Sequence, residues 1–208
     1  MSSQRLSGWG RTAWTNATTE SPNSVADVKS LISTHPDRGV IARGLGRSYG
    51  AAAQNAGGLV LMMADGALGQ GIVLDKTTGL LTASAGVSLD DILKYAVPRG
   101  FFVPVTPGTR FVTVGGAIGS DIHGKNHHFD GSFGQHVVSM DVLLSSGEVV
   151  TLSPENDPVR FWATVGGMGL TGVVLTATLR MLRIESSKVV VETERLKDFD
   201  AVVAAMSS

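Results

Sequence analysis

The chain has 208 residues, a formal net charge of -1, 26 glycines and no cysteine. Its near-neutral charge gives no global field for nucleic acid or anionic lipid, and the lack of cysteine excludes disulfides, thiolate metal sites and a cysteine nucleophile. No apolar run approaches the roughly 18 residues that a membrane-spanning helix needs. The N-terminal segment "MSSQRLSGWGRTAW" has no apolar core, so we expect no signal peptide, and the sequence assigns the chain to neither the cytoplasmic nor the periplasmic face of a membrane.

Short apolar segments in the first half of the chain follow helical and strand patterns. Apolar residues at helical spacing predict a helix over residues 24–33. Apolar runs bounded by glycine predict strands over residues 39–44, 57–63 and 79–85. Glycine gathers in clusters along the chain, which favours close approach of the backbone to a ligand.

Capping residues indicate two further helices. Ser88 is the expected N-cap of a helix in the segment "SLDDILKYAVPRG", which Gly100 ends. Asp157 and Pro158 occupy the N-cap and the first helical position of the segment "DPVRFWATVGG". On that second helix we expect Trp162 to pack in the core.

The last third of the chain combines strand patterns with an apolar helix. The segment "VVSMDVLLSSGEVVTLS" predicts a hairpin, and "TGVVLTATLRML" predicts a long strand. The segment "VVVETERLKDFDAVVAAMSS" predicts one more strand and then a helix with an apolar stripe. We expect residues 1–185 to form one domain and residues 186–208 to begin a further domain that is cut short. A frayed terminal helix is the alternative interpretation.

The first glycine-rich loop, in "IARGLGRSYG", has the spacing G-x-G-x-x-x-G over residues 44–50. This is close to a Rossmann fingerprint, and Asp65 even supplies an acid at the expected distance. However, the stretch before the next strand is too short for the crossover helix of a parallel unit. We therefore expect the loop to wrap a diphosphate with its own N–H groups, with charge from Arg43 or Arg47. An ordinary glycine-rich turn is the alternative.

A second glycine-rich loop follows about 65 residues later, in "VPVTPGTRFVTVGGAIGSDIHG". Thr113 precedes the pair Gly115 and Gly116, and a short helix that starts there would aim its N–H groups at a phosphate. Polar side chains follow within one or two turns, at Ser120, Asp121 and His123. Two anion-binding loops fit an extended dinucleotide better than a single phosphate.

Together, "ARGLGRSYG" and "PGTRFVTVGGAIGSDIHGKNHH" resemble the FAD-binding domain of the vanillyl-alcohol oxidase (PCMH) type. With "GSFG" and "FWATVGGMGLTG", they resemble more closely the family of decaprenylphosphoryl-β-D-ribose 2′-oxidases, over nearly the whole chain. The resemblance implies an α+β fold of two mixed α/β subdomains with FAD between them. Family members continue into a substrate-binding cap domain, so we expect this chain alone to be an incomplete enzyme.

The resemblance also implies the residues that contact FAD. They are Ala42, Arg43, Gly44, Leu45, Gly46, Arg47, Ser48, Tyr49, Gly50, Ala51, Ala52, Gly108, Thr113, Val114, Gly115, Gly116, Ser120, Asp121, Ile122, His123 and Val173. Two positions depart from the family: Ala51 stands where an aspartate is usual, and Ser120 where a cysteine occurs. Arg47 stands where a histidine attaches the flavin in some members of the superfamily, so we expect non-covalent FAD.

The activity that the resemblance implies is oxidation of a sugar hydroxyl. The 2′-hydroxyl of decaprenylphosphoryl-β-D-ribose would become a ketone, as the first half of an epimerisation to the arabinose form for cell-wall arabinan synthesis. An NAD(P)H-dependent keto-reductase would be the partner, and the lipid-linked substrate implies peripheral contact with a membrane. His123, Lys125 and Tyr49 are the candidate catalytic residues. A sugar-lactone or alditol oxidase, or a non-catalytic FAD-binding fragment, are the alternatives.

The histidines also suggest a metal site, because His123 and His127 have the i, i+4 spacing of a zinc-binding helix. Gly124 and Asn126 disfavour that helix, and Lys125 would repel a cation. We therefore expect no metal site here, a contribution of His123 to the flavin site, and a structural role for His127.

Overall fold

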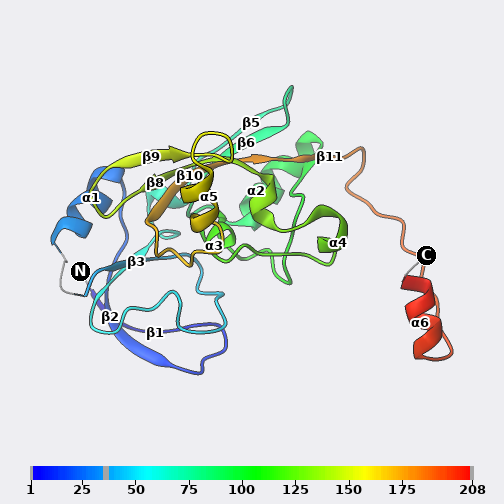
Figure 1. The fold of residues 1–208 in the computed structure, drawn as a ribbon, viewed down its shortest axis with the longest axis horizontal. Helices are drawn as coiled ribbons and strands as arrows, with labels where there is room; N and C mark the ends of the chain where they lie inside the picture. The colour runs from blue at the N-terminus through cyan, green and yellow to red at the C-terminus, as the bar shows by residue number, and fades with distance from the viewer. Residues whose placement is uncertain (1, 35–37, 207–208) are drawn as a thin grey trace.

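The computed structural model describes residues 2–34 and 38–206. The first unit is a 4-stranded sheet in the order β1-β2-β4-β3 with one helix (Figure 1). The elements of this unit are β1 (Ser2–Ser7), β2 (Trp14–Glu20), α1 (Val25–Thr34), β3 (Val40–Arg43) and β4 (Leu59–Met62). The helix and the last two strands match the sequence prediction, whereas the polar strands β1 and β2 were not predicted.

The connection between β3 and β4 contains no helix, as its length predicted. The two strands nevertheless pair in parallel, from Val40 opposite Leu59 to Arg43 opposite Met62. The expectation that a helix-free connection argues against a parallel unit was therefore wrong. Two side-chain hydrogen bonds of Arg43, to the carbonyl oxygens of Ala53 and Ser7, fasten this connection to the sheet.

The second unit is a 5-stranded antiparallel sheet in the order β5-β6-β10-β8-β9 with short helices. Its principal elements are β5 (Ile72–Asp75), β6 (Leu80–Ser84), α2 (Leu89–Ala96), α3 (Val114–Gly119), β8 (Val137–Leu143), β9 (Val149–Leu152), α5 (Pro158–Thr164) and β10 (Val173–Arg180). The minor elements are η1 (Ala67–Gly69), η2 (Val97–Arg99), β7 (Phe101–Phe102), α4 (His127–Asp130), η3 (Phe133–His136) and β11 (Leu182–Arg183). The predicted hairpin is β8–β9, and the predicted long strand is β10.

Both predicted helix caps are present. The Ser88 hydroxyl accepts a hydrogen bond from the N–H of Asp91, and the Asp157 carboxylate accepts one from the N–H of Arg160. On α5, Phe161 is fully buried, but Trp162 is 46% exposed, so the prediction of a buried tryptophan was wrong. Successive helical side chains point about 100° apart, and a short helix over a sheet buries only one of its faces.

The two units meet through a shared apolar core. Val28, Leu59, Leu61 and Met63 of the first unit pack with Leu143, Val173 and Leu175 of the second. A larger core fills the second unit between its sheet and helices α2, α3 and α5. Because β4 and β10 both contribute to the shared core, the ends of these strands are held close together, and the cleft described below lies between the units.

After β11 the chain leaves the body of the protein. Figure 1 shows α6 (Phe199–Met206), in red, set apart at the end of an extended segment. The helix was predicted correctly, but none of its residues is buried. The strand predicted at Val189, Val190 and Val191 is absent, and these side chains are 86%, 94% and 76% exposed. The division at residue 185 stays a prediction. In residues 2–34 and 38–206 no helix has the length and apolarity to cross a bilayer.

Candidate functional site

The loop after β3 presents unused backbone donors. Within the described chain, no backbone N–H from Leu45 to Gly50 donates a hydrogen bond. The carbonyl oxygens of Ser48 and Tyr49 do accept hydrogen bonds, from Trp9 and Gly10. Gly46 has a φ of 66°, which favours glycine and turns the loop sharply. Consecutive free N–H groups in such a turn form a concave site for an anion, so this loop fits a diphosphate.

The two arginines near this loop have different surroundings. The Arg43 guanidinium donates to the carbonyl oxygens of Ala53, at 2.9 Å, and Ser7, at 2.7 Å, and burial lowers the pKa of Arg43. Its side chain therefore supports the loop from inside the protein. The Arg47 guanidinium lies 5.0 Å from the centre of the Trp9 ring. Arg47 is thus the better placed of the two to add positive charge beside a diphosphate.

Helix α3 carries the Gly115–Gly116 pair, and Thr113 is its N-cap. The first-turn N–H groups are all occupied: Val114 donates to Val87 O at 2.9 Å, Gly115 to Ala85 O at 2.8 Å, and Gly116 to the Thr113 hydroxyl at 3.2 Å. The expectation that this helix aims its N–H groups at a phosphate was therefore wrong. The carbonyl groups that follow β6 lie against the start of the helix and take the donors that a ligand would need.

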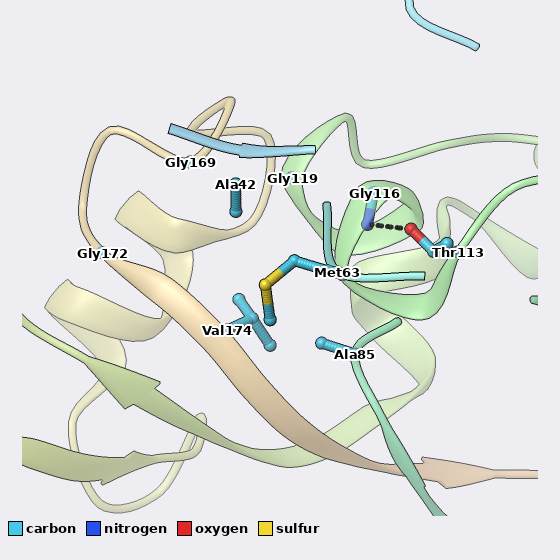
Figure 2. A pocket seen from close by; sticks show the side chains of 10 residues that line it. Ala42, Met63, Ala85, Thr113, Gly116, Gly119, Gly169, Gly172 and Val174 are labelled. Carbon is cyan, nitrogen blue, oxygen red and sulfur yellow. Dashed lines mark hydrogen bonds between the residues drawn. The ribbon is translucent and has the colours of Figure 1, made fainter. Parts of the chain in front are cut away.

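A small cleft with a volume of about 50 Å³, partly open to solvent, lies between the two units. Figure 2 shows the side chains of Ala42, Met63 and Val174 pointing into it from β3, the end of β4 and β10. Its other lining residues are Ala85, Thr113, Gly115, Gly116, Gly119, Gly169 and Gly172. Because half of the lining residues are glycines, bare backbone forms much of the surface, and a flat ring system fits against such a surface.

At one wall of the cleft the sequence analysis predicted only Val173. The loop 166–172 packs over α3, with hydrogen bonds from Gly166 N to Ile118 O at 2.9 Å and from Met168 N to Gly119 O at 2.8 Å. Met168 has a φ of 52°, a left-handed conformation that is rare for a residue with a side chain. The glycine-rich stretch "GGMGLTG" is the sequence feature that could have indicated close approach of this loop to a ligand. Val173 itself packs in the core between the units, and its neighbours Gly172 and Val174 line the cleft.

The residues that follow α3 support the cleft from behind. Asp121 has a φ of 39°, and its carboxylate accepts a hydrogen bond from Gly134 N at 2.9 Å. Ile122 packs against the core of the second unit. The Ser120 hydroxyl lies 3.9 Å from the Met168 sulfur, which ties α3 to the loop 166–172.

The candidate catalytic residues are exposed. The backbone of His123 forms an isolated antiparallel β-bridge with Ser132. The centre of its ring lies 5.2 Å from the centre of the His127 ring. Lys125 comes from the same segment, whereas Tyr49 extends from the loop of the first unit and is 81% exposed. Among the described residues, no hydrogen bond or ring contact joins Tyr49 to His123 or Lys125. The structure therefore places two candidates on one unit and the third on the other.

His127 makes a hydrogen bond with its own segment, between Nδ1 and Gly124 O at 2.9 Å. It begins helix α4, so His123 and His127 do not share a helix. In the part of the chain that the structure describes, no group of three His, Asp or Glu side chains has a metal-binding arrangement.

The exposed loop that carries Gly108 is fastened to α2 by Asp90. The Asp90 carboxylate forms ion pairs with Arg110 at 2.6 Å and Lys94 at 2.7 Å, and its backbone N–H donates to Arg110 O at 3.0 Å. The hydrogen bond from Lys94 and the charges of Lys94 and Arg110 hold the pKa of Asp90 below its usual value. Ala51 and Ala52, also predicted to contact FAD, are exposed beside the first loop.

Comparisons with known proteins agree with this geometry. Residues 18–153 match the family of FAD binding domains. A decaprenylphosphoryl-beta-D-ribose oxidase of Mycolicibacterium smegmatis is 51% identical over 97% of this chain and 44% of that protein. Cytokinin dehydrogenase 4 of Arabidopsis thaliana is 30% identical over 68% of this chain and 28% of that protein. D-arabinono-1,4-lactone oxidase of Yarrowia lipolytica is 29% identical over 58% of this chain and 24% of that protein. The chain spans less than half the length of these curated relatives.

Proposed function

This chain belongs to the FAD-binding domain family, and on that premise we propose that it is the flavin-binding part of an oxidase of decaprenylphosphoryl-β-D-ribose. Family membership confirms the predicted α+β FAD-binding fold and FAD as the cofactor. The single observation that carries the substrate proposal is the 51% identity, over 97% of this chain, to the M. smegmatis oxidase of that name.

The loop after β3 and the cleft together suit FAD. The free N–H groups between Leu45 and Gly50 would hold the diphosphate, with Arg47 beside them. The bare backbone at Gly116, Gly119 and Gly169 would receive the flat flavin ring. When bound, FAD supplies a two-electron acceptor for the hydride that leaves the carbon bearing the substrate hydroxyl. The protein orients that carbon against the ring and excludes water from it.

The hydroxyl proton needs a base, and we propose His123 or Lys125 for this role, with Tyr49, on the other unit, as a third candidate. His123 and Lys125 lie on the segment that continues from α3, whose last residue, Gly119, lines the cleft. The base takes the proton while the carbon loses its hydride, so the alcohol becomes a ketone. A keto-reductase that uses NAD(P)H would then consume the 2′-keto sugar, which completes an epimerisation toward cell-wall arabinan.

The second candidate function is oxidation of a free sugar lactone or alditol. The 29% identity to the Y. lipolytica D-arabinono-1,4-lactone oxidase favours it. Both candidates use the same flavin cleft, so they differ only in the substrate that reduces the flavin.

Anaerobic mixing of each substrate with a flavin-loaded protein that also contains the substrate-binding cap domain distinguishes the two candidates, because we expect the present chain alone to be an incomplete enzyme. We expect decaprenylphosphoryl-β-D-ribose to bleach the visible flavin absorbance, and D-arabinono-1,4-lactone to leave it unchanged. Bleaching by the lactone alone would favour the second candidate. A protein that neither retains FAD nor takes it up in a titration would contradict both.

A further inference from the structure

The turn between β1 and β2 lies against the loop after β3, in the lower part of Figure 1. Trp9 N donates a hydrogen bond to Ser48 O at 2.7 Å, and Gly10 N donates to Tyr49 O at 3.3 Å. The Arg43 guanidinium also donates to Ser7 O, at the end of β1. Three hydrogen bonds therefore join the first hairpin of the chain to the segment that begins at the end of β3.

These hydrogen bonds set the direction of the free donors. In a trans peptide the C=O of one residue and the N–H of the next point in opposite directions. Because the carbonyl groups of Ser48 and Tyr49 point toward the turn, the N–H groups of Tyr49 and Gly50 point away from it. Neither N–H group donates to another described residue. The turn thus decides which way two of the loop's free donors face.

The contact is too close to admit side chains. A Cβ added at Gly8 would lie 2.7 Å from Ser48 O and would overlap Gly50 O, and one added at Gly10 would lie 2.8 Å from Tyr49 O. Such short distances require the backbone to shift. The turn also contains Arg11 with a φ of 51°, and a left-handed residue persists only where its surroundings hold it.

The same turn holds the side chain of the loop's charged residue. The Arg47 guanidinium lies 5.0 Å from the centre of the Trp9 ring, which is 59% exposed. This distance is within the range of a cation–π contact. On the same hairpin, the Arg5 guanidinium lies at the same distance, 5.0 Å, from the ring of Trp14. Trp14 belongs to β2, where it pairs with Ser7 of β1. Among the described residues, no hydrogen bond joins the Trp14 backbone to the loop after β3.

We propose that the turn of residues 8–11 is a positioning element for the diphosphate of FAD. Its backbone fixes the direction of the N–H groups of Tyr49 and Gly50, and the Trp9 ring holds the Arg47 guanidinium beside them. This inference rests on the proposed function, because it assigns the loop after β3 to the diphosphate. It concerns how tightly FAD is held and leaves the chemistry at the flavin ring to other residues.

FAD titrations of the full chain and its variants test the proposal. Gly8→Ala should raise the Kd for FAD at least tenfold, as expected for the loss of one hydrogen bond to a charged group. The visible spectrum of the flavin at saturation should stay as in the wild type, because the ring site is untouched. Trp9→Ala should raise the Kd several-fold, and Trp9→Phe should restore it, since phenylalanine also provides a ring face for Arg47.

Trp14→Ala is the matched control, because it removes the equivalent tryptophan–arginine contact away from the loop. We expect its Kd for FAD to equal that of the wild type. An unchanged Kd in both Gly8→Ala and Trp9→Ala would overturn the proposal. So would an altered flavin spectrum together with a lower melting temperature of the FAD-free protein, because that pattern indicates a general structural role. Failure of the wild-type chain to bind FAD would instead contradict the proposed function.

Discussion

Gly44 lies directly against Thr113, and this contact joins the two glycine-rich loops across the two units. A Cβ at Gly44 would overlap the Thr113 hydroxyl oxygen and would lie 2.9 Å from the Thr113 methyl carbon. Thr113 is itself only 3% exposed and caps α3. The absence of a side chain at position 44 therefore allows the diphosphate loop to approach the helix that forms the floor of the cleft.

Gly44→Ala should push the first loop away from α3. We expect a loss of about 1–3 kcal/mol in the free energy of unfolding, as in other overpacked sites, and weaker FAD binding. The same change made in a Thr113→Ala background should cost clearly less, because the overlapping hydroxyl and methyl groups are gone. Urea unfolding of the four proteins in this double-mutant cycle measures the difference. Equal costs in the two backgrounds would show that the contact with Thr113 is not the reason for glycine at position 44.

Gly115 and Gly116 are adjacent, but substitution should lower stability at the first and FAD affinity at the second. A Cβ at Gly115 would lie 3.0 Å from the Cβ of Ala85, which is only 3% exposed, so Gly115→Ala should chiefly lower the melting temperature. Gly116 is exposed and lines the cleft. It is the third residue of α3, a position at which a capped helix accepts a side chain. Gly116→Val should therefore keep the secondary structure and lower FAD affinity at least tenfold, about 1.4 kcal/mol. Circular dichroism and FAD titration measure both effects, and unchanged affinity in Gly116→Val would remove α3 from the flavin site.

FAD should be bound without a covalent link. The chain has no cysteine, and Arg47 occupies the loop position at which a linking histidine stands in some relatives. Acid precipitation of the flavin-loaded protein should release all the yellow colour into the supernatant. Colour that stays with the washed pellet would identify a covalent flavin and contradict this prediction.

Asp121 should stabilise the fold through its hydrogen bond to Gly134 N rather than through its charge. Asp121→Ala should cost about 1–3 kcal/mol, because it leaves the N–H of a buried glycine without an acceptor. Asp121→Asn should be close to neutral, since asparagine also accepts this bond and tolerates the positive φ. Thermal unfolding of both variants measures the difference, and equal melting temperatures for them would assign the effect to charge.

The ion pairs of Asp90 should make stability depend on pH. Because the folded pKa of Asp90 is lowered, its contribution is present above the unfolded value of about 3.9 and is lost as the pH falls through the folded value. Asp90→Asn should therefore lower the melting temperature at neutral pH, and this deficit should shrink as the pH falls below about 4. Glu155→Gln, an exposed control in the second unit, should show no such pattern. A deficit for Asp90→Asn that is the same at low and neutral pH would exclude the ionic explanation.

Most helices and the apolar strands could be predicted because their signals are local. Ser88 and Asp157 each cap a helix through an N–H group three residues ahead, so the pattern is complete within one short segment. The strands β1 and β2 escaped prediction because their sequences, "SSQRLS" and "WTNATTE", are polar and pair along the edge of a sheet. The valines at 189–191 have high strand propensity but form no strand, because in the described chain no other strand lies beside them to supply hydrogen bonds.

The two glycine-rich loops, the short helix that starts after Thr113 and the family that the motifs resemble could all be predicted from the sequence alone. Which of the two loops keeps free N–H donors depends on the tertiary structure. The N–H groups of Gly115 and Val114 donate to the carbonyl groups of Ala85 and Val87, which lie far away in the sequence, whereas those from Leu45 to Gly50 donate to no residue that the structure describes. The tertiary structure alone also brought Gly169 and Gly172 into the cleft. A helix cap is formed by residues within one helical turn of each other, so the local sequence is enough to predict it. The acceptor of a backbone N–H group can instead come from a segment far away in the sequence, and only folding brings the two together.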